Sequence, residues 1–322
     1  MKRIVVRDPG GPERLVLEDA PTPVPGPHDV VIDVAAAGVN FIDVYFRTGL
    51  YKAESPVTIG SEAAGTVSAV GAEVTGIRTG DRVAYAMQRG AYAEQVAVPA
   101  AAVVKIPDAV SFETAAAVML QGMTAHYLTH STFPIAPGHT CLVHAAAGGA
   151  GGLIVQMAKA QGARTIGTVS TEEKADEARR LGCDEVIRYT TQDFEAEVLR
   201  LTGGRGVHVV YDSVGATTFE KGLKVLRPRG TMVLFGQSSG PVAPIDPQVL
   251  NARGSVYLTR PSLAHYVATP EELRWRATDL MDLIVSGALV VRVSGRYPLA
   301  GAADAHRDLE GRKTMGKLLL VP

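Results

Sequence analysis

The chain has 322 residues, 46% of them hydrophobic and 20% charged, with a formal net charge of −1 at pH 7. This length allows two domains, and the balanced charge gives no overall field that would attract nucleic acid or an anionic membrane. The only cysteines, Cys141 and Cys183, are too few for a disulfide framework or a cysteine-rich metal cluster. The opening residues MKRIVVRDPGG predict a strand and a turn rather than a signal peptide, and no apolar run reaches membrane-spanning length. We therefore expect a soluble protein of the reducing cytoplasm.

The first third of the chain predicts an antiparallel β domain. KRIVVRD and RLVLEDA flank a DPGGPE turn, a pattern typical of a hairpin. Short apolar strands separated by Gly and Pro follow, which favours a small rolled sheet or barrel. Residues 111–130 predict a helix that leads into the next domain.

Residues 138–159 predict a strand, a glycine turn and a helix. TCLVHA has the composition of a buried strand, and LIVQMAKA has apolar residues at helical spacing. Between them, Gly148, Gly149, Gly151 and Gly152 remove side chains from the turn. A diphosphate can approach such a turn, and the amide groups at the start of the helix then face its negative charge. Because the strand and the helix are both present, this pattern indicates dinucleotide binding rather than a tight turn alone.

The following segment predicts an α/β fold with a doubly wound parallel sheet. Apolar strands alternate with helices of similar length, which is the pattern of βαβ units. The expected strands cover 165–170, 185–189, 207–215 and 231–236, and the expected helices 171–182, 193–203 and 217–226. Ser170 and Glu173 have the spacing of a capping box for the first of these helices.

The end of the second strand of this sheet indicates which cofactor is used. An NAD site usually places an acid there for the ribose hydroxyls. This chain has no acid until Glu172. Ser170, Lys174 and Tyr189 offer a hydroxyl, an amine and a phenol, which suit a 2′-phosphate and favour NADPH. Lys174 as an ordinary solvated lysine of a charged helix is the alternative.

The C-terminal part predicts two helices and a last strand. Thr269, Pro270 and Glu272 have the pattern of a helix start. LAGAADAHRDLEG predicts another helix, and KLLLVP a final strand. Because the parallel sheet is complete before this point, we expect the tail to return to the first domain.

These motifs resemble those of a known family, the zinc-free quinone oxidoreductases related to zeta-crystallin. This family belongs to the medium-chain dehydrogenase/reductase superfamily. The family signature fits 138–159, with Ala145, Gly148 and Gly151 as its AxxGxxG loop. Other matching stretches are 38–51, 60–67, 121–128, 235–242, 258–266 and 312–322. The resemblance implies a GroES-like, β-rich catalytic domain (1–120 and 265–322) around a Rossmann domain (121–264), with NADPH in the cleft between them.

The same resemblance predicts that no metal is bound. Zinc-dependent members of the superfamily carry Cys near position 40 and His near position 61, where this chain has Asn40 and Ser61. Zinc needs three or four thiolate, imidazole or carboxylate ligands. His126 and His130, four residues apart on a helix, have the spacing of half a site, but we interpret them as packing or surface residues.

Two residues are expected beside the nicotinamide and the substrate by resemblance, Asn40 and Tyr45. Tyr45 either lines and positions the substrate, the interpretation we favour, or donates a hydrogen bond to a quinone oxygen. Asp43 is expected to be a structural hydrogen-bond acceptor rather than a base. A quinone is a good hydride acceptor, so alignment with the cofactor in a dry cleft is enough for reduction.

The remaining cofactor contacts also follow from the resemblance. Thr124 is expected near the nicotinamide amide and Arg312 as a second cation at the 2′-phosphate, while Phe235 and Leu258 are the residues most open to a packing role instead. The full expected set is Asn40, Thr124, Gly148, Gly149, Ala150, Gly151, Ser170, Lys174, Tyr189, Val214, Gly215, Phe235, Gly236, Ser238, Leu258 and Arg312.

Three functions remain open at this stage. The first is an NADPH:quinone reductase, the second an NADPH-dependent reductase of enones or alkenals, and the third an NADPH-binding protein with a structural or RNA-associated role. The even charge counts against RNA. The resemblance also implies a homodimer that pairs sheet edges along 256–261, unless the C-terminal helix covers that edge.

Overall fold

The chain folds into two units, Met1–Met123 with Val267–Pro322, and Thr124–Tyr266. The computed structural model describes residues 1–312 and 314–322, so Lys313, in the last stretch that resembles the family, lies outside the described residues. The domain boundaries expected at 120/121 and 264/265 fall inside helices α2 (Phe112–Tyr127) and α8 (Leu263–Tyr266); the observed boundaries lie inside α2, after Met123, and at the end of α8, after Tyr266. The C-terminal segment Val267–Pro322 belongs to the first unit.

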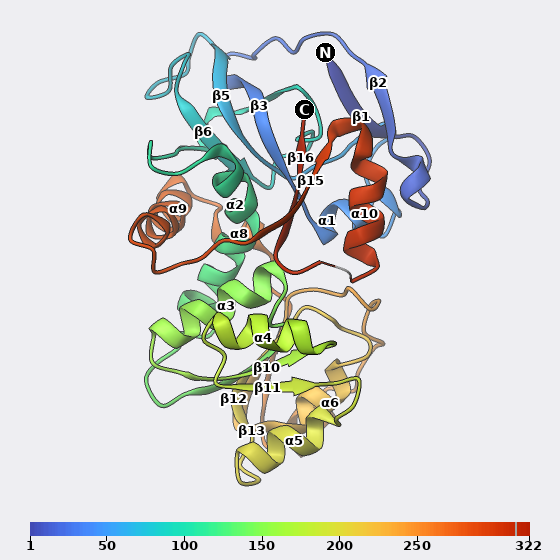
Figure 1. Ribbon diagram of the computed structural model, residues 1–322, viewed down its shortest axis with the longest axis vertical. Coiled ribbons are helices and arrows are strands. Elements are labelled where there is room, and N and C mark those ends of the chain that lie inside the picture. Colours follow the sequence, from blue (N-terminus) through green and yellow to red (C-terminus); the bar gives the residue numbers. More distant parts are fainter. Residues whose placement is uncertain (313) are drawn as a thin grey trace. The chain divides into compact units, whose positions relative to one another are not determined.

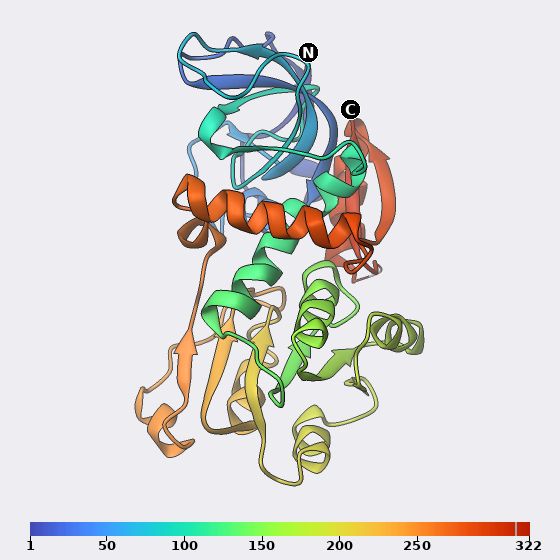
Figure 2. The same cartoon turned by 90° about the vertical axis from the view of Figure 1, so that its left-hand side faces the viewer.

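The first unit is built on two sheets, and its larger sheet curls strongly (Figure 2). The smaller sheet has the order β2-β1-β4, in which β1 and β2 form the predicted hairpin. The larger has the order β15-β16-β3-β5-β6-β8, with β7 also paired to β3. The strands are β1 (Lys2–Val6), β2 (Val16–Asp19), β3 (Asp29–Val39), β4 (Val57–Thr58), β5 (Glu62–Val70), β6 (Arg82–Ala86), β7 (Gln95–Pro99), β8 (Val103–Lys105), β15 (Val293–Pro298) and β16 (Lys317–Val321).

Register explains how distant parts of the sequence meet in this unit. β16 runs antiparallel to β3, with Leu318 opposite Val39 and Leu320 opposite Ala37. β5 pairs with the same strand, so Ala63 also lies opposite Ala37. Residues near 40, 62 and 317 are therefore brought to one end of the sheet by strand pairing.

Helices α1 (Phe41–Arg47), α9 (Pro270–Val285) and α10 (Ala302–Glu310) complete the first unit, together with most of α2. α9 begins as predicted, because the Thr269 side chain accepts a hydrogen bond from the backbone N–H of Glu272. Trp275, the single tryptophan of the chain, is 45% exposed on this helix, and the Arg276 guanidinium lies 4.6 Å from its ring centroid. Short 3-10 helices occupy Pro12–Arg14, Ala100–Ala102 and Leu299–Gly301.

The second unit contains the predicted parallel sheet (Figure 1). Its strand order, β11-β10-β9-β12-β13-β14, is that of a doubly wound dinucleotide-binding fold, with the switch point between β9 and β12. The strands are β9 (Thr140–His144), β10 (Arg164–Val169), β11 (Glu185–Arg188), β12 (Val207–Asp212), β13 (Leu226–Leu234) and β14 (Tyr257–Thr259). This arrangement confirms the predicted fold class.

Helices cover both faces of this sheet, α3 and α4 on one side and α5 and α6 on the other (Figure 1). Each follows the strand that the periodicity predicted. The helices are α3 (Gly149–Ala160), α4 (Glu172–Arg180), α5 (Phe194–Leu201), α6 (Phe219–Lys224), α7 (Gln248–Ala252) and α8. A buried cluster that includes Leu142, Ile166, Val210 and Met232 forms part of the core around the sheet.

Two local predictions need correction. The expected helix 111–130 ends at Tyr127 and continues as a wider π-helical turn over Leu128–Thr132. Ser170 is not the cap of α4; Thr171 is, and its side chain accepts from the backbone N–H of Lys174. The spacing from Ser170 to Glu173 suggested a capping box, but the adjacent threonine begins the helix one residue later.

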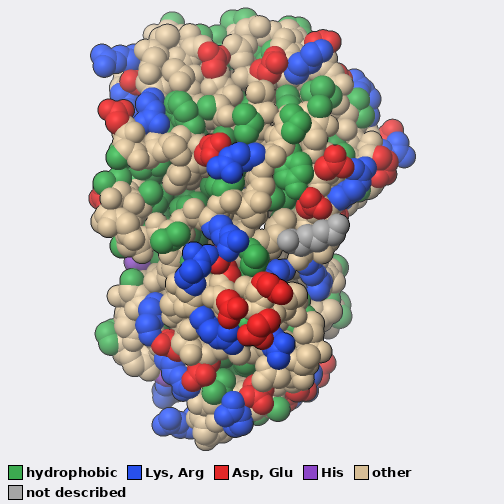
Figure 3. Space-filling view, in the orientation of Figure 1, with side chains coloured by type: hydrophobic (Ala, Val, Ile, Leu, Met, Phe, Trp, Pro, Cys, Tyr) green, Lys and Arg blue, Asp and Glu red, His purple; other side chains and the backbone are tan. Residues whose placement is uncertain are grey.

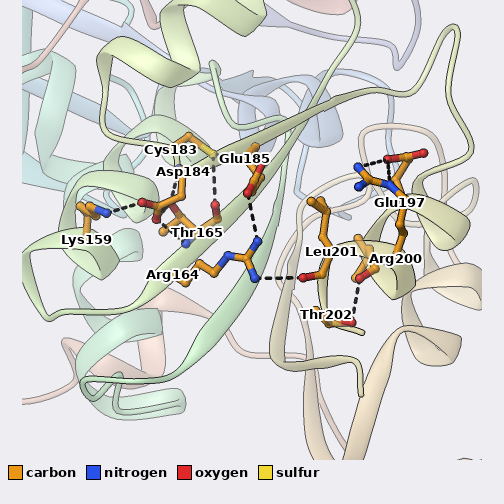
Figure 4. Close-up of polar contacts among 11 residues, drawn as sticks. Lys159, Arg164, Thr165, Cys183, Asp184, Glu185, Glu197, Arg200, Leu201 and Thr202 are labelled. Atoms are coloured by element: carbon orange, nitrogen blue, oxygen red, sulfur yellow. Dashed lines mark hydrogen bonds and ion pairs between the residues drawn. The ribbon is translucent and has the colours of Figure 1, made fainter. Parts of the chain in front are cut away.

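Polar contacts join the amino ends of β10 and β11, at the end of the sheet opposite the glycine turn (Figure 4). Asp184 accepts from the backbone and hydroxyl of Thr165, at 2.9 and 3.1 Å, and also binds Lys159. The Arg164 guanidinium joins Glu185 to the carbonyl of Leu201, at 3.0 Å each. These contacts fix the starts of the two strands at the end of the sheet opposite the glycine turn.

The surface carries both signs of charge. Lys and Arg side chains alternate with Asp and Glu over the face in Figure 3, without a single-sign field on that face. Among the described residues, none of the helices has the length and apolar character needed to cross a membrane.

Candidate functional site

The glycine turn after β9 leaves backbone close to the start of α3. Gly148 is the N-cap, so Gly149, Ala150 and Gly151 form the first turn, whose N–H groups have no acceptor within the helix. A Cβ added at Gly151 would lie 2.2 Å from the Ala145 carbonyl oxygen, which only glycine avoids. Side-chain-free backbone at the positive end of a 12-residue helix fits the diphosphate of a dinucleotide.

Two of the three predicted ribose-side residues, Ser170 and Tyr189, directly follow the carboxyl ends of neighbouring strands, and Lys174 lies in the helix after the first of these strands. Val169 and Arg188 are paired in register at the ends of β10 and β11. Ser170 and Tyr189, the next residues of the two strands, therefore lie at the same end of the sheet. The Thr190 hydroxyl donates to the Ser170 carbonyl at 2.9 Å and holds the two loops together. Lys174 lies in the first turn of α4, and Tyr189 is 41% exposed.

Glu172, the first acid after the second strand of the parallel sheet, is held by two arginines. Its carboxylate lies 3.1 Å from Nη1 of Arg179 and 3.1 Å from Nε of Arg188. These ion pairs bind the carboxylate that an NAD site would direct to the ribose. The observation supports the assignment of a 2′-phosphate at this end.

Asp212, which sequence reasoning missed, shapes the loops after β12 and β13. Its fully buried carboxylate accepts from the backbone N–H groups of Val214 and Gly215, at 2.7 and 3.0 Å, and from the Thr218 hydroxyl. Its carbonyl accepts from the Phe235 N–H at 2.8 Å. The last residue of a buried strand followed by turn residues was the available signal.

The same two loops are joined by further backbone bonds. The Ser238 N–H donates to the Ser213 carbonyl at 3.1 Å, and a Cβ at Gly236 would lie 2.6 Å from that oxygen. The structure therefore brings five predicted residues together at the carboxyl ends of β12 and β13: Val214, Gly215, Phe235, Gly236 and Ser238. Leu258, by contrast, packs against the core of this unit, which fits the alternative of a packing role.

The remaining predicted cofactor residues, Thr124 and Arg312, belong to different units. Thr124 is the first residue of the second unit, buried in α2 with 9% exposure. Arg312 belongs to the first unit, after the end of α10, and its backbone N–H donates to the Leu309 carbonyl.

Asn40 lies in the interior of the first unit, beside a buried ion pair that the sequence did not reveal. Lys317 Nζ lies 2.5 Å from Glu62 Oε2 and 2.6 Å from Asn40 Oδ1. Asn40 Nδ2 donates to the same Glu62 oxygen at 2.9 Å. All three side chains are at most 2% exposed, so the pair is screened from solvent.

Asp43 is held by a second set of contacts around the start of α1. Its carboxylate accepts from the Ser61 hydroxyl at 2.7 Å and from the Asn40 backbone N–H at 3.0 Å. Burial is the larger effect and raises the pKa of the Asp43 carboxyl to about 6. The hydrogen bonds and the Lys317 charge act against this rise. The contacts agree with the expected role of Asp43 as a structural acceptor.

The network continues toward α10. The Tyr92 hydroxyl lies 3.2 Å from Asp43 Oδ2 and 3.1 Å from Nε2 of His306. Arg47 contacts Nδ1 of His306 at 3.1 Å. It also forms a bidentate ion pair with Glu310, in which both N···O distances are 2.8 Å. Burial and the Arg47 charge lower the pKa of His306 to about 3, so this imidazole is neutral.

Tyr45 belongs to an aromatic group on α1 and the loop after it. Its ring centroid lies 5.2 Å from that of Tyr51, edge to face, and 6.3 Å from that of Phe41. Tyr51 is a further residue that sequence reasoning missed. The group offers flat apolar surfaces suited to a planar acceptor.

The residues at the zinc-ligand places do not fit zinc. Asn40 faces an ammonium group, and Ser61 donates to a carboxylate. His126 and His130 stack face to face with centroids 4.1 Å apart, and His130 Nδ1 lies 3.0 Å from the His126 carbonyl. Within 1–312 and 314–322, no group of three or more His, Cys, Asp or Glu is arranged to hold a metal ion.

Comparisons with known proteins agree with this architecture. A family model for the alcohol dehydrogenase GroES-like domain matches residues 26–108, and one described as zinc-binding dehydrogenase matches 149–280. The quinone oxidoreductase of Pseudomonas aeruginosa is 46% identical over the whole chain and 99% of its own length. The chain belongs to the quinone oxidoreductase family of medium-chain dehydrogenases.

Two further proteins that resemble this chain are an NADPH complex and a reductase of a different substrate. The crystal structure of Escherichia coli quinone oxidoreductase complexed with NADPH superposes over the full length of both chains with a TM-score of 0.98 and 44% identity. A 2-haloacrylate reductase from a Burkholderia species is 43% identical over 99% of this chain and 98% of its own length. The predicted family is confirmed.

Proposed function

We propose that this protein reduces quinones with NADPH by hydride transfer and without a metal. The observation that carries the proposal is the side-chain-free turn at the N-terminus of α3, where a Cβ at Gly151 would meet the Ala145 carbonyl. Lys174 nearby and the arginine-bound Glu172 favour the phosphorylated cofactor. The family relatives named as quinone oxidoreductases support the acceptor.

In this proposal, NADPH is bound by four groups of residues. Gly148, Gly149, Ala150 and Gly151 hold the diphosphate through backbone N–H groups. Ser170, Lys174 and Tyr189 bind the 2′-phosphate, with Arg312 as a second cation. Val214, Gly215, Phe235, Gly236 and Ser238 line the rest of the dinucleotide, and Thr124 the nicotinamide amide.

In the first unit, Tyr45 and Tyr51 hold a flat acceptor, and Asn40 fixes the start of α1. NADPH, when bound, supplies the hydride. Addition to a quinone gives a stabilised hydroquinone anion that water protonates, so no acid of the chain is required. Asp43 serves as an acceptor for Ser61 and Asn40 rather than as a base.

The direct test is oxidation of NADPH with a panel of benzoquinones, naphthoquinones, enones, 2-haloacrylates and simple aldehydes. We expect turnover with quinones and none with simple aldehydes. The second candidate, reduction of an activated double bond, is favoured by the similarity to a 2-haloacrylate reductase. Turnover of enones or haloacrylates without quinones would replace the first proposal by this one.

We also propose that two copies pair along β14 in the cytoplasm. β14 pairs only with β13 among the described strands, and Tyr257 on it is 62% exposed. An open sheet edge rich in β-forming residues is protected when a second copy continues the sheet. Light scattering at micromolar concentration should give twice the chain mass, and a monomer mass would reject the pairing.

A further inference from the structure

The buried ion pair beside Asn40 exhausts most of the hydrogen-bonding capacity of the Asn40 amide. Its two N–H groups donate to the Gly38 carbonyl at 3.2 Å and to Glu62 at 2.9 Å, and its oxygen accepts from Lys317 at 2.6 Å. An amide nitrogen carries two donors and its oxygen accepts at most two bonds. Asn40 therefore has no donor left for a ligand and at most one acceptor site, on the oxygen that also faces the capping box at the start of α1.

Lys317 determines which way this amide faces. An ammonium group only donates hydrogen bonds, so the amide oxygen, not the nitrogen, must face Nζ. Glu62 reinforces the choice because its Oε2 accepts from both neighbours. Without the lysine, only the acceptors on the nitrogen side, Glu62 and the Gly38 carbonyl, still distinguish the two ends of the amide.

The surroundings leave little room for this cluster to move. A Cβ at Gly38 would lie 2.3 Å from Glu62 Oε2 and 2.7 Å from Lys317 Cε. Glu62 also accepts from the backbone N–H of Leu120 at 2.6 Å, which ties the pair to α2. The backbone of β3 and the helix thus hold the ion pair from two sides.

We propose that Lys317 and Glu62 are positioning residues for the reduction, which orient Asn40 as a hydrogen-bond acceptor and fix the start of the helix that carries Tyr45. This inference rests on the proposed function, since it assigns the pair a role in the same site. The backbone N–H of Asn40 is bound by Asp43, and Tyr45 follows one turn later on α1. Misorientation of Asn40 would therefore disturb both the acceptor group and the aromatic surface.

The test compares four variants of the full chain. Lys317→Met alone leaves a buried carboxylate without its cation, which is strongly destabilising. The double variant Glu62→Gln/Lys317→Met removes both charges and keeps an acceptor for Leu120. Lys317→Arg keeps the cation. Lys105→Met, which removes a lysine paired with Asp81 on the surface of the same unit, is the matched control.

Thermal unfolding, the calorimetric Kd for NADPH, and kcat and KM for a benzoquinone are measured for each. In the double variant we expect a wild-type-like unfolding temperature and NADPH Kd, with kcat lowered about tenfold or more, or about 1.4 kcal/mol. Lys317→Arg should recover part of kcat relative to Lys317→Met, and Lys105→Met should leave kcat unchanged. A folded double variant with wild-type kcat would overturn the inference alone, whereas a wild type without turnover of any acceptor would overturn the proposed function and the inference together.

Discussion

The two units hold their proposed site residues by different means. In the second unit the proposed diphosphate site consists of backbone groups, placed by a strand, a turn and a helix that are continuous in sequence. In the first unit the corresponding groups are side chains from β3, β5 and β16, which meet only through strand pairing. A site made of backbone depends on local sequence, whereas a site made of buried side chains depends on the whole sheet.

The difference extends to electrostatics. The helix end presents partial charges that need no counterion, so it tolerates exposure to solvent. The first unit instead buries full charges, and each must have a partner: Lys317 has Glu62, and Arg47 has Glu310. Loss of one partner there leaves an unpaired buried charge.

The sharpest way to break the backbone site is Gly151→Ala. The new Cβ would lie 2.2 Å from the Ala145 carbonyl, so the turn must shift. We expect NADPH affinity to fall about 100-fold or more, which corresponds to about 3 kcal/mol. Gly148→Ala is the matched control, since its Cβ would lie 3.1 Å from the same oxygen and should have a smaller effect in the same calorimetric titration.

The next prediction concerns the side-chain part of the second unit. Lys174→Ala should weaken NADPH about 10- to 100-fold, because charge-assisted hydrogen bonds to a phosphate contribute about 1.5–3 kcal/mol. NADH affinity should not change, and Tyr189→Phe should have a smaller effect. Equal loss for both cofactors would show that Lys174 does not bind the 2′-phosphate.

Acid should reveal the buried network of the first unit. The pKa of His306 is lowered from 6.5 to about 3 in the folded chain, so the unfolded chain binds this proton more readily. The stabilisation is complete above pH 6.5 and is lost as the pH falls toward 3. At pH 4 this contribution is about 2–3 kcal/mol smaller than at pH 7.

Urea unfolding of wild type and His306→Gln between pH 7 and pH 4 isolates this contribution. The variant should lose less of its free energy of unfolding over that range. Asp43 acts in the opposite direction, because burial raises the pKa of its carboxyl to about 6, and this carboxyl is present in both proteins. Parallel pH curves would contradict the assignment to His306.

The smallest expected effect is that of metal removal. Since Asn40 faces an ammonium and Ser61 a carboxylate, chelators should leave NADPH oxidation unchanged. Elemental analysis should find far less than one zinc per chain. Stoichiometric zinc with chelator-sensitive turnover would reject the metal-free proposal.

The sequence predicted the second unit well because its signals are local. The glycine turn and the alternation of strands and helices both appear as expected. Ser170 as a cap was wrong because two adjacent residues could both cap α4, and only the backbone path selects Thr171. Asp212 was missed since its role lies in loop hydrogen bonds rather than in a motif.

In the first unit the sequence indicated Asn40 and Tyr45 only through resemblance. It gave no sign of Glu62 or Lys317, because a lysine in a final strand and a glutamate at a strand start are both ordinary surface residues elsewhere. Their meeting requires the register of β16, β3 and β5. Long-range pairing of this kind is not visible in local periodicity.

The position of Trp275 gives the two units different optical signatures. It is the single tryptophan of the chain and lies on α9 in the first unit, so residues 124–266 contain none. Its partial exposure and the adjacent guanidinium make its emission sensitive to loss of the helix. Selectively excited tryptophan fluorescence therefore follows melting of the first unit alone, while circular dichroism follows both. A gap between the two melting curves would measure, without any label, how independently the halves of the protein unfold.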